Sequence, residues 1–404
     1  MNYLFSFCKI HKKYNHIYIK MASNLYLDKI LQRITENTNT MSHVGIIIAS
    51  PSEDPPYKYH WVRDSALVMR TFIDMYSKTK DPLYFQYIMN YLENENKIQT
   101  LDTITGLGEP KYNINCTPFN GEWGRPQNDG PALRGIMLFK IIELFQYKYD
   151  VIIQNMIIPI IIKDLHYIMQ NYNQVSFDLW EENKGWHFYT RMVQLKFLKD
   201  SIKYYKHIQG EINLQDINDC FKQLSSDIQD HICENYIISS FDDSGNITKH
   251  HDAANILAFC HIDYDEEILK IVPLEYVNET CDKLIHSFRE KYNHDELNLI
   301  GRYADDKYYN GHVWVLCSLA LGQIYIELYK RRNIVNYSSP MHRSKSNPNN
   351  NYIEISNGIL ERILTLDPNL ILPEQFNPID STYYSAKKLT WNYSELYQLY
   401  NLLN

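Results

Sequence analysis

Apolar residues recur at every third or fourth position along most of this chain, and that spacing is the strongest constraint on its fold. In the segment from Asp64 to Tyr76, for example, Leu67, Val68 and Phe72 fall on one side of a helix. Few segments show the alternating pattern of a strand. The chain is therefore predicted to be all-α, with helices at residues 64–76, 81–91, 131–147, 151–172, 188–207, 214–234, 252–260, 263–272, 274–292, 308–331, 352–365 and 382–403.

The helical segments are expected to form one domain. A length of 404 residues taken alone favours two or three domains. The one polar, helix-poor tract is Ser338–Asn351, and about fifty residues follow it, fewer than a typical second domain needs. We therefore expect a single domain over residues 23–404, with residues 1–22 as an N-terminal appendage outside the fold and Met21 as an alternative start.

Charge and motif content argue against several function classes. The net charge is -8, so the chain lacks the basic footprint of a nucleic-acid-binding protein. Gly106 and Gly108 lack the third glycine of a phosphate-binding loop, and no G-x-S-x-G nucleophile motif occurs. The seven cysteines and the histidines show no metal-ligand spacing. We expect no metal, no cofactor and no nucleic-acid partner.

The apolar segments do not predict a membrane protein. The N-terminal apolar run is too short for a secretory signal, and basic residues follow it instead of preceding it. The most apolar internal segment, Met156–Ile162, contains Pro159, so a buried helix is expected there. We therefore expect no membrane partner, a monomer, and a cytoplasmic or otherwise intracellular location.

Two adjacent carboxylates beside a tryptophan, in the segment Asp178–Glu182, have a clear chemical use. Cleavage of a glycosidic bond needs an acid that is still protonated near neutral pH. A neighbouring carboxylate and an apolar ring both raise the pKa of a glutamate. Taken alone, however, such a pair is more often part of a solvated helix end.

A second segment, Tyr57–Asp64, places an arginine and an aspartate beside aromatic residues. Arg63 can donate to sugar hydroxyls and Asp64 can accept from them, although a structural ion pair at a helix start explains the pair equally well. The remaining loop segments with glycine, proline or aromatic residues are Trp123–Pro131, Gly301–Trp314, Pro373–Phe376 and Ser385–Tyr393. Binding and catalytic groups usually lie in such loops.

Taken in order, these segments resemble glycoside hydrolase family 15, the fungal-type glucoamylases. The matching stretches are Ala49–Val68, Gly106–Asn113, Trp123–Gly135, Asp178–Glu182, Gly301–Trp314 and Ser385–Leu396. The resemblance implies an (α/α)6 barrel, with six inner helices ringed by six outer ones and an active site in the loops between them. It also implies that a starch-binding domain is absent from this chain.

The resemblance assigns roles to thirteen residues. The family's general acid corresponds to Glu181 and its general base to Glu374. The family inverts configuration, and inverting enzymes hold their two carboxyl groups roughly 6.5–9.5 Å apart to admit a water molecule. The residues implied to bind substrate, with Tyr57 also holding the water, are Tyr57, Trp61, Arg63, Asp64, Trp123, Leu179, Trp180, Glu182, Arg302, Trp314 and Trp391.

The implied activity is exo-hydrolysis that releases β-D-glucose from the non-reducing ends of α-1,4-glucans such as maltooligosaccharides, glycogen and starch, with slower action on α-1,6 links. Two alternatives stay open: an α-glucosidase of other linkage preference, for trehalose or isomaltose, and an inactive glycan-binding protein. The chain departs from the family at Ser176-Phe177, at His312-Val313, and at Lys387-Lys388, where the usual Arg-Asp is absent and an ion pair is expected to be lost.

Overall fold

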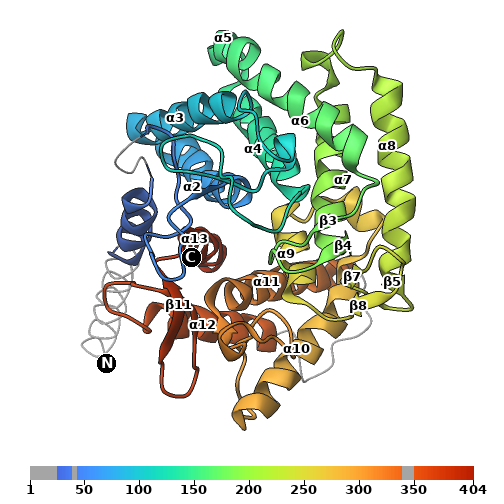
Figure 1. Ribbon diagram of the computed structural model, residues 1–404. Helices are drawn as coiled ribbons and strands as arrows, with labels where there is room; N and C mark the ends of the chain where they lie inside the picture. Colours follow the sequence, from blue (N-terminus) through green and yellow to red (C-terminus); the bar gives the residue numbers. More distant parts are fainter. Residues whose placement is uncertain (1–24, 39–42, 339–349) are drawn as a thin grey trace, which may run out of the picture.

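The computed structural model describes residues 25–38, 43–338 and 350–404. The expected appendage at residues 1–22 and most of the polar tract, residues 339–349, lie outside these ranges. Within them the chain is mainly helical, as the apolar spacing predicts, and its helices form two concentric rings (Figure 1).

The inner ring consists of six helices, on each of which most of the described side chains are buried. Each contacts the next, and the last returns to the first, which closes the ring. In Figure 1 the C-terminal helix lies beside the first of them. The inner helices are α2 (Val62–Thr79), α4 (Asp129–Phe145), α7 (Phe188–Lys203), α9 (Ala253–His261), α11 (Val315–Ser338) and α13 (Thr390–Leu403).

The outer helices bury one face each, because they have a neighbour on one side only. On α8, for example, Ile217 and Leu224 are the fully buried residues. Each of five outer helices packs on the inner helix that precedes or follows it. They are α3 (Pro82–Ile98), α6 (Ile158–Asn171), α8 (Leu214–Asp227), α10 (Val277–Tyr292) and α12 (Asn350–Leu364); a helix at residues 25–36 completes the set. The predicted (α/α)6 barrel is confirmed.

The number of predicted helices was right partly because two errors cancel. The helix at residues 25–36 was not predicted. The helix predicted at 263–272 is wrong, because Asp263 and Tyr264 have φ of 53° and 51°, in the left-handed region that a right-handed helix cannot include. Only a 3-10 turn at Ile268–Lys270 forms there.

The start of the last predicted helix is also wrong. Residues Tyr383–Lys387 form the strand β11, and α13 begins only at Thr390. Strand β11 pairs with β10 (Pro373–Phe376), which pairs with β9 (Val313–Trp314). Ser385 and Lys388 have φ of 61° and 56°, which prevents the helix from extending back over this segment.

Short strands gather where the inner helices begin. Strands β1 (His60–Trp61), β4 (Lys184–His187) and β9 run directly into α2, α7 and α11. Strand β1 pairs with β2 (Lys111–Tyr112), and a four-stranded sheet joins β3 (Ser176–Phe177), β4, β7 (Ser240–Phe241) and β8 (Ile247–Lys249). A separate hairpin joins β5 (Ile232–Cys233) and β6 (Tyr236–Ile237). These strands fix the loops at one end of the barrel.

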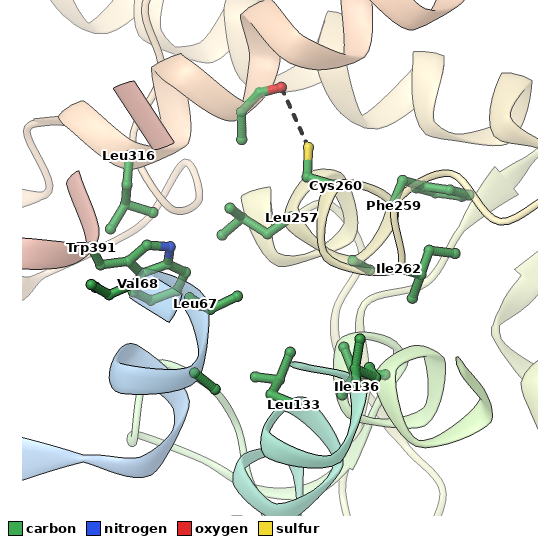
Figure 2. Packing of buried hydrophobic residues seen from close by; sticks show 14 of the residues in the cluster. Leu67, Val68, Leu133, Ile136, Leu257, Phe259, Cys260, Ile262, Leu316 and Trp391 are labelled. Carbon is green, nitrogen blue, oxygen red and sulfur yellow. Dashed lines mark hydrogen bonds between the residues drawn. The ribbon is translucent and has the colours of Figure 1, made fainter. Parts of the chain in front are cut away.

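Apolar side chains from the inner helices fill the barrel. In Figure 2, Leu67, Leu133 and Leu257 point from α2, α4 and α9 toward a common centre, beside Trp391 of α13 and Leu316 of α11. Burial of such residues is the main source of stability in a fold of this size. The buried apolar side chains of the inner helices therefore belong to one continuous core.

A buried carboxylate lies within this apolar centre. Glu395 on α13 accepts hydrogen bonds from Arg70 on α2, from His261 Nε2 on α9 (3.1 Å), from Gln323 Nε2 on α11 (2.8 Å), and from Trp391 Nε1 (2.8 Å). Burial acts to raise the pKa of Glu395, but the charge of Arg70 and the hydrogen bonds outweigh it and lower the pKa. One side chain thus links four inner helices.

One helical stretch, Asp150–Asn171, is long and apolar enough to cross a membrane by length and composition. In this fold the stretch contains the outer helix α6, which packs on α4 and α7. Ile158, Ile161 and Leu165 are buried there, and 44% of the most apolar window is buried. In the segment Met156–Ile162, where a buried helix was predicted, four residues are buried and three are half-buried.

The Glu395 cluster gives a stability prediction. Glu395→Gln removes the charge that faces buried Arg70, and an uncompensated buried charge costs about 3 kcal/mol or more. The apparent melting temperature should fall clearly. Glu279→Gln is the control, because its pair with Lys283 is exposed (3.7 Å) and should contribute less than about 1 kcal/mol. Equal melting temperatures for Glu395→Gln and wild type would contradict the prediction.

Candidate active site

A cavity of about 320 Å³ opens at the end of the barrel where the strands gather. All thirteen residues singled out from the sequence line it, although they come from segments far apart in the chain. Arg63 and Asp64 come from the first turn of α2, and Trp391 from the first turn of α13. The expectation that the important residues lie outside helices is therefore wrong for these three.

The first glutamate lies in a tight turn between β3 and β4. Asp178 Oδ1 accepts from the backbone N–H groups of Glu182 (2.8 Å) and Asn183 (3.3 Å), which closes the turn. Glu181 itself has a φ of 68°, an unusual conformation for a residue with a side chain. Trp180 Nε1 donates to Asp252 Oδ1 (2.9 Å) and anchors the turn to the start of α9. The turn therefore holds Glu181 in one orientation.

Both carboxylate oxygens of Glu181 are hydrogen-bonded. Trp61 Nε1 donates to Oε1 and Trp123 Nε1 donates to Oε2, each at 2.6 Å. Arg63 Nη2 also donates to Oε1 (3.0 Å). Trp123 therefore lies directly beside the glutamate. Three rigid or charged donors thus surround one carboxylate.

Arg63 is buried, and acidic groups surround it. Its Nη1 donates to Gln127 Oε1 and to Asp129 Oδ2, both at 2.9 Å. Burial acts to lower the pKa of this guanidinium, but the charges of Asp129, Glu181 and Asp64 outweigh it and raise the pKa. Burial raises the pKa of Asp64 to about 7, although Arg63 partly opposes this rise. Among the described residues, the buried Nε of Arg63 has no hydrogen-bond partner.

The second glutamate, Glu374, lies on β10 and is almost completely buried. Ser385 on the neighbouring strand β11 donates a hydrogen bond to its Oε2. The hydroxyl of Tyr308 lies 3.1 Å from Ser385 Oγ and 2.9 Å from the hydroxyl of Tyr57. Burial raises the pKa of Glu374 to about 7, although the hydrogen bonds of Ser385 and Tyr57 and the charge of Arg302 oppose the rise.

A third cluster forms one rim of the cavity. Arg302 Nη2 donates to Glu182 Oε1 (2.7 Å), and its Nε donates to Asp306 Oδ2 (2.8 Å). Tyr303 also donates to Glu182 through its hydroxyl (2.5 Å). The guanidinium carbon of Arg302 lies 4.8 Å from the ring centre of Trp314. Glu182 is therefore fixed in place while its side chain stays 30% exposed to the cavity mouth.

Several residues at the site were not given a role from the sequence. They include Lys111, Asp129, Tyr308 and Ser385. Each lies in or beside a segment that was noted for its composition, but none has a signature by itself. Their positions depend on pairings such as β10 with β11 that the chain spacing does not specify. Among the residues that the structure covers, no cluster of ligand side chains could hold a metal ion.

The departures from the family pattern have structural partners. Lys388 Nζ pairs with Glu36 (3.2 Å), so an ion pair is present at this position. His312 stacks on Tyr384, with ring centres 4.0 Å apart, and the hydroxyl of Tyr292 lies 2.6 Å from its Nδ1. Ser176 pairs in β3, where its carbonyl oxygen lies 3.0 Å from Nε2 of His187. None of these residues lines the cavity.

Known proteins are similar to this chain in both sequence and fold. The sequence model of Glycosyl hydrolases family 15 matches residues 20–401. Glucoamylase-1 of Arthroderma benhamiae is 30% identical over 395 aligned positions, covering 87% of this chain and 63% of that protein. The intracellular, sporulation-specific glucoamylase of Saccharomyces cerevisiae is 28% identical over 438 positions, covering 89% and 78%.

Among solved structures, the glycoside hydrolase family 15 glucoamylase from Hypocrea jecorina matches with a TM-score of 0.78 at 27% identity. The match covers 93% of this chain and 70% of that chain. This chain spans less than two thirds of the length of the Arthroderma relative. The likeness therefore covers most of this chain but only part of the relatives' length.

The buried state of Glu374 predicts a pH-dependent stability effect. Its pKa is raised to about 7 in the folded protein, so folding opposes its ionisation, and stability should fall as the pH rises from about 4.5 to 7. At pH 8, the free energy of unfolding of Glu374→Gln should therefore exceed that of wild type by on the order of 3 kcal/mol, and the variant should melt at a higher temperature. At pH 4, the two proteins should melt at the same temperature. Exposed Glu290→Gln is the control. A gain that does not depend on pH would contradict this.

Proposed function

Because this chain belongs to glycosyl hydrolases family 15, we propose that it is a glucan 1,4-α-glucosidase. It removes β-D-glucose, with inversion, from the non-reducing ends of maltooligosaccharides, glycogen or starch, and it cleaves α-1,6 links more slowly. The observation that carries the proposal is the placement of Glu181, Glu374, Arg63 and Asp64 around one cavity. The names of the relatives, all glucoamylases, support it.

In this proposal Glu181 is the general acid. It gives its proton to the glycosidic oxygen as the bond to C1 breaks, and it becomes a carboxylate. The indole N–H groups of Trp61 and Trp123 and the guanidinium of Arg63 already point at its two oxygens. Donors held in place before the reaction stabilise a charge that develops in the transition state. The leaving sugar departs as a neutral alcohol.

Glu374 is the general base. It takes a proton from a water molecule, whose oxygen attacks C1 from the face opposite the leaving group and produces the β-anomer. The hydroxyl groups of Ser385, Tyr308 and Tyr57 form a chain beside it that can orient this water. Because the base works only when ionised, its pKa of about 7 sets the acidic limit of activity. We expect the two carboxyl groups to lie roughly 6.5–9.5 Å apart.

Arg63 and Asp64 account for action at chain ends. Among the described residues, Arg63 Nε is a buried donor without a hydrogen-bond partner, although it lies 3.7 Å from Asp64 Oδ2, and Trp314 Nε1 is another buried donor without one. Both residues line the cavity, and a sugar bound there would supply the acceptors that these donors lack. Asp64 can accept from a neighbouring hydroxyl. In this proposal, the groups around Arg63 leave no room for a further sugar, so the sugar that binds beside Arg63 and Asp64 is the terminal one.

The remaining assignments concern partners and place of action. We propose an oligo- or polysaccharide as the partner, a monomer, and no role for nucleic acid, a membrane or a cofactor. An intracellular location is supported by the name of the yeast relative, which is itself described as intracellular. Soluble oligosaccharides or glycogen are the proposed substrates.

The first experiment follows the products of maltoheptaose by proton NMR. Wild type should release β-glucose first. Glu181→Gln and Glu374→Gln should each lose about 100-fold or more of the rate, which is the usual contribution of a general acid or base. Early α-glucose or short oligosaccharides would contradict the mechanism. Absence of any product, followed by activity on trehalose or isomaltose, would point to the alternative linkage; no activity on either would point to glycan binding alone.

A second substrate separates the two roles. Fluoride leaves α-D-glucosyl fluoride without needing a proton, so Glu181→Gln should hydrolyse this substrate at a rate within about tenfold of wild type. Glu374→Gln should remain inactive on it, because the water still needs a base. The opposite pattern would exchange the assigned roles of the two glutamates.

The hydrogen bond to Glu374 gives a pH prediction. Ser385→Ala removes a donor that lowers the pKa of Glu374, so this pKa should rise further. The acidic limb of kcat/KM should then move to higher pH, because the base ionises later. Ser318→Ala is the matched control, since Ser318 is a buried serine that bonds to Ile300. An unchanged acidic limb in Ser385→Ala would contradict the role of this hydrogen bond.

A further inference from the structure

Lys111 is a buried cation without a counter-ion in contact. It lies on β2, directly opposite Trp61 on β1, and is only 1% exposed. In the described part of the chain, no carboxylate lies within 4.0 Å of its Nζ, and Nζ makes no hydrogen bond. A buried ammonium group normally requires a partner. Here the partners are of a different kind.

Four aromatic rings enclose the ammonium group. Nζ lies 3.1 Å from the ring centre of Trp123, 4.3 Å from that of Phe119, and 4.5 Å from those of Tyr59 and Trp61. The rings contact one another edge to face: Trp61 with Trp123 at 6.0 Å, and Tyr59 with Phe119 at 5.2 Å. A cation is attracted to the negative face of an aromatic ring, most strongly where water is excluded. The rings and the lysine form one cage.

The cage contacts the proposed acid directly. Two of its four rings, Trp61 and Trp123, donate their indole N–H groups to Glu181, one to each oxygen. A positive charge on the face of an indole draws electron density from the ring and strengthens the N–H as a donor. It also attracts the carboxylate beyond the ring, because the site has a low effective dielectric constant.

We propose that Lys111 is a positioning residue for the general acid: through Trp61 and Trp123 it fixes the side chain of Glu181 and stabilises the carboxylate that Glu181 becomes. The proton passes from Glu181 to the glycosidic oxygen, and Lys111 keeps its own protons throughout. This inference rests on the proposed function, since it assigns a role within that reaction. It leaves the base, Glu374, unaffected.

The charges around the cage are consistent with this role. The groups that act on Lys111 are Glu181, Arg125 and Glu109, and Arg125 Nε bonds to Glu109 (2.9 Å), so these two largely offset each other. Burial lowers the pKa of Lys111 to about 8, against the opposing charge of Glu181. On the other side of Glu181 lie Arg63 and Asp64. Lys111 is thus a cation at neutral pH and loses its charge under mildly alkaline conditions.

The test compares Lys111→Met, which keeps the aliphatic bulk, with Lys111→Arg, which keeps the charge. Lys196→Met is the control, because Lys196 is a buried lysine paired with Asp200, remote from the cavity. The pH dependence of kcat and KM is measured on maltoheptaose. Lys111→Met should lower kcat about tenfold with KM within about twofold. Its alkaline limb, which reports the proton on the general acid, should move to higher pH while the acidic limb stays.

Lys111→Arg should keep the kcat of wild type to within about threefold, and Lys196→Met should leave both limbs in place. A fall in kcat for Lys111→Met without movement of the alkaline limb would reduce Lys111 to a structural residue and overturn the inference. So would an arginine variant as impaired as the methionine variant. If wild type itself releases no glucose, the proposed function fails instead.

A second measurement does not require activity. Loss of the charge of Lys111 beside two indoles should change the tryptophan fluorescence, with a midpoint near pH 8, in wild type and in Lys196→Met. This transition should be absent from Lys111→Met and Lys111→Arg. Its persistence in either variant would overturn the cage as the source. Because folded Lys111→Arg suffices for this comparison, the test holds even where Lys111→Met does not fold.

Discussion

The guanidinium of Arg63 allows three carboxyl groups to lie close together, two of them, Asp64 and Glu181, in the lining of the cavity. Asp64, Asp129 and Glu181 all act on it, and without the cation they would repel one another in a low-dielectric site. Arg63 occupies this place because it lies in the first turn of α2, and Asp129 because it is the first residue of α4. The inner ring, which brings the first turns of α2 and α4 together, is therefore what makes the charge cluster possible.

The closed ring explains why such a cluster is rigid. Glu395 joins α2, α9, α11 and α13 at the centre of the barrel, and its partner Trp391 also lines the cavity. The short strands then fix the positions of the two glutamates, which lie outside the helices. Glu374 lies on the middle strand of β9, β10 and β11, and Glu181 lies in the turn that β3 and β4 close. Helices supply the distances between segments, and strands supply the orientation of the two glutamates.

The sequence predicted most helices and the residues that line the cavity. Apolar spacing marks a helix wherever one face is buried. The barrel and the cavity residues followed from the resemblance of several ordered segments to one family, because the segment around Glu181 is weak evidence when taken alone. The helix predictions were wrong where a backbone angle decides the structure, as at Asp263 and Ser385, whose positive φ ends or prevents a helix. The sequence also assigned no role to Ser385 or Lys111. Both act through side chains that strand pairing brings close, and nothing in the spacing of the chain specifies β10 with β11 or β1 with β2.

In the proposed mechanism, the surroundings of the two glutamates separate the acid from the base. Rigid N–H donors and a cation, from Trp61, Trp123 and Arg63, bond to Glu181, with Lys111 behind the two indoles, and such donors would stabilise the anion that appears as the acid gives up its proton. Hydroxyl groups that can reorient surround Glu374. Hydroxyls both donate and accept, so they can follow a water molecule that loses its proton, whereas fixed donors cannot. The kind of partner, more than the number of partners, therefore distinguishes the two carboxyl groups, and it follows from where each one lies: Glu181 in the turn between β3 and β4, and Glu374 on β10.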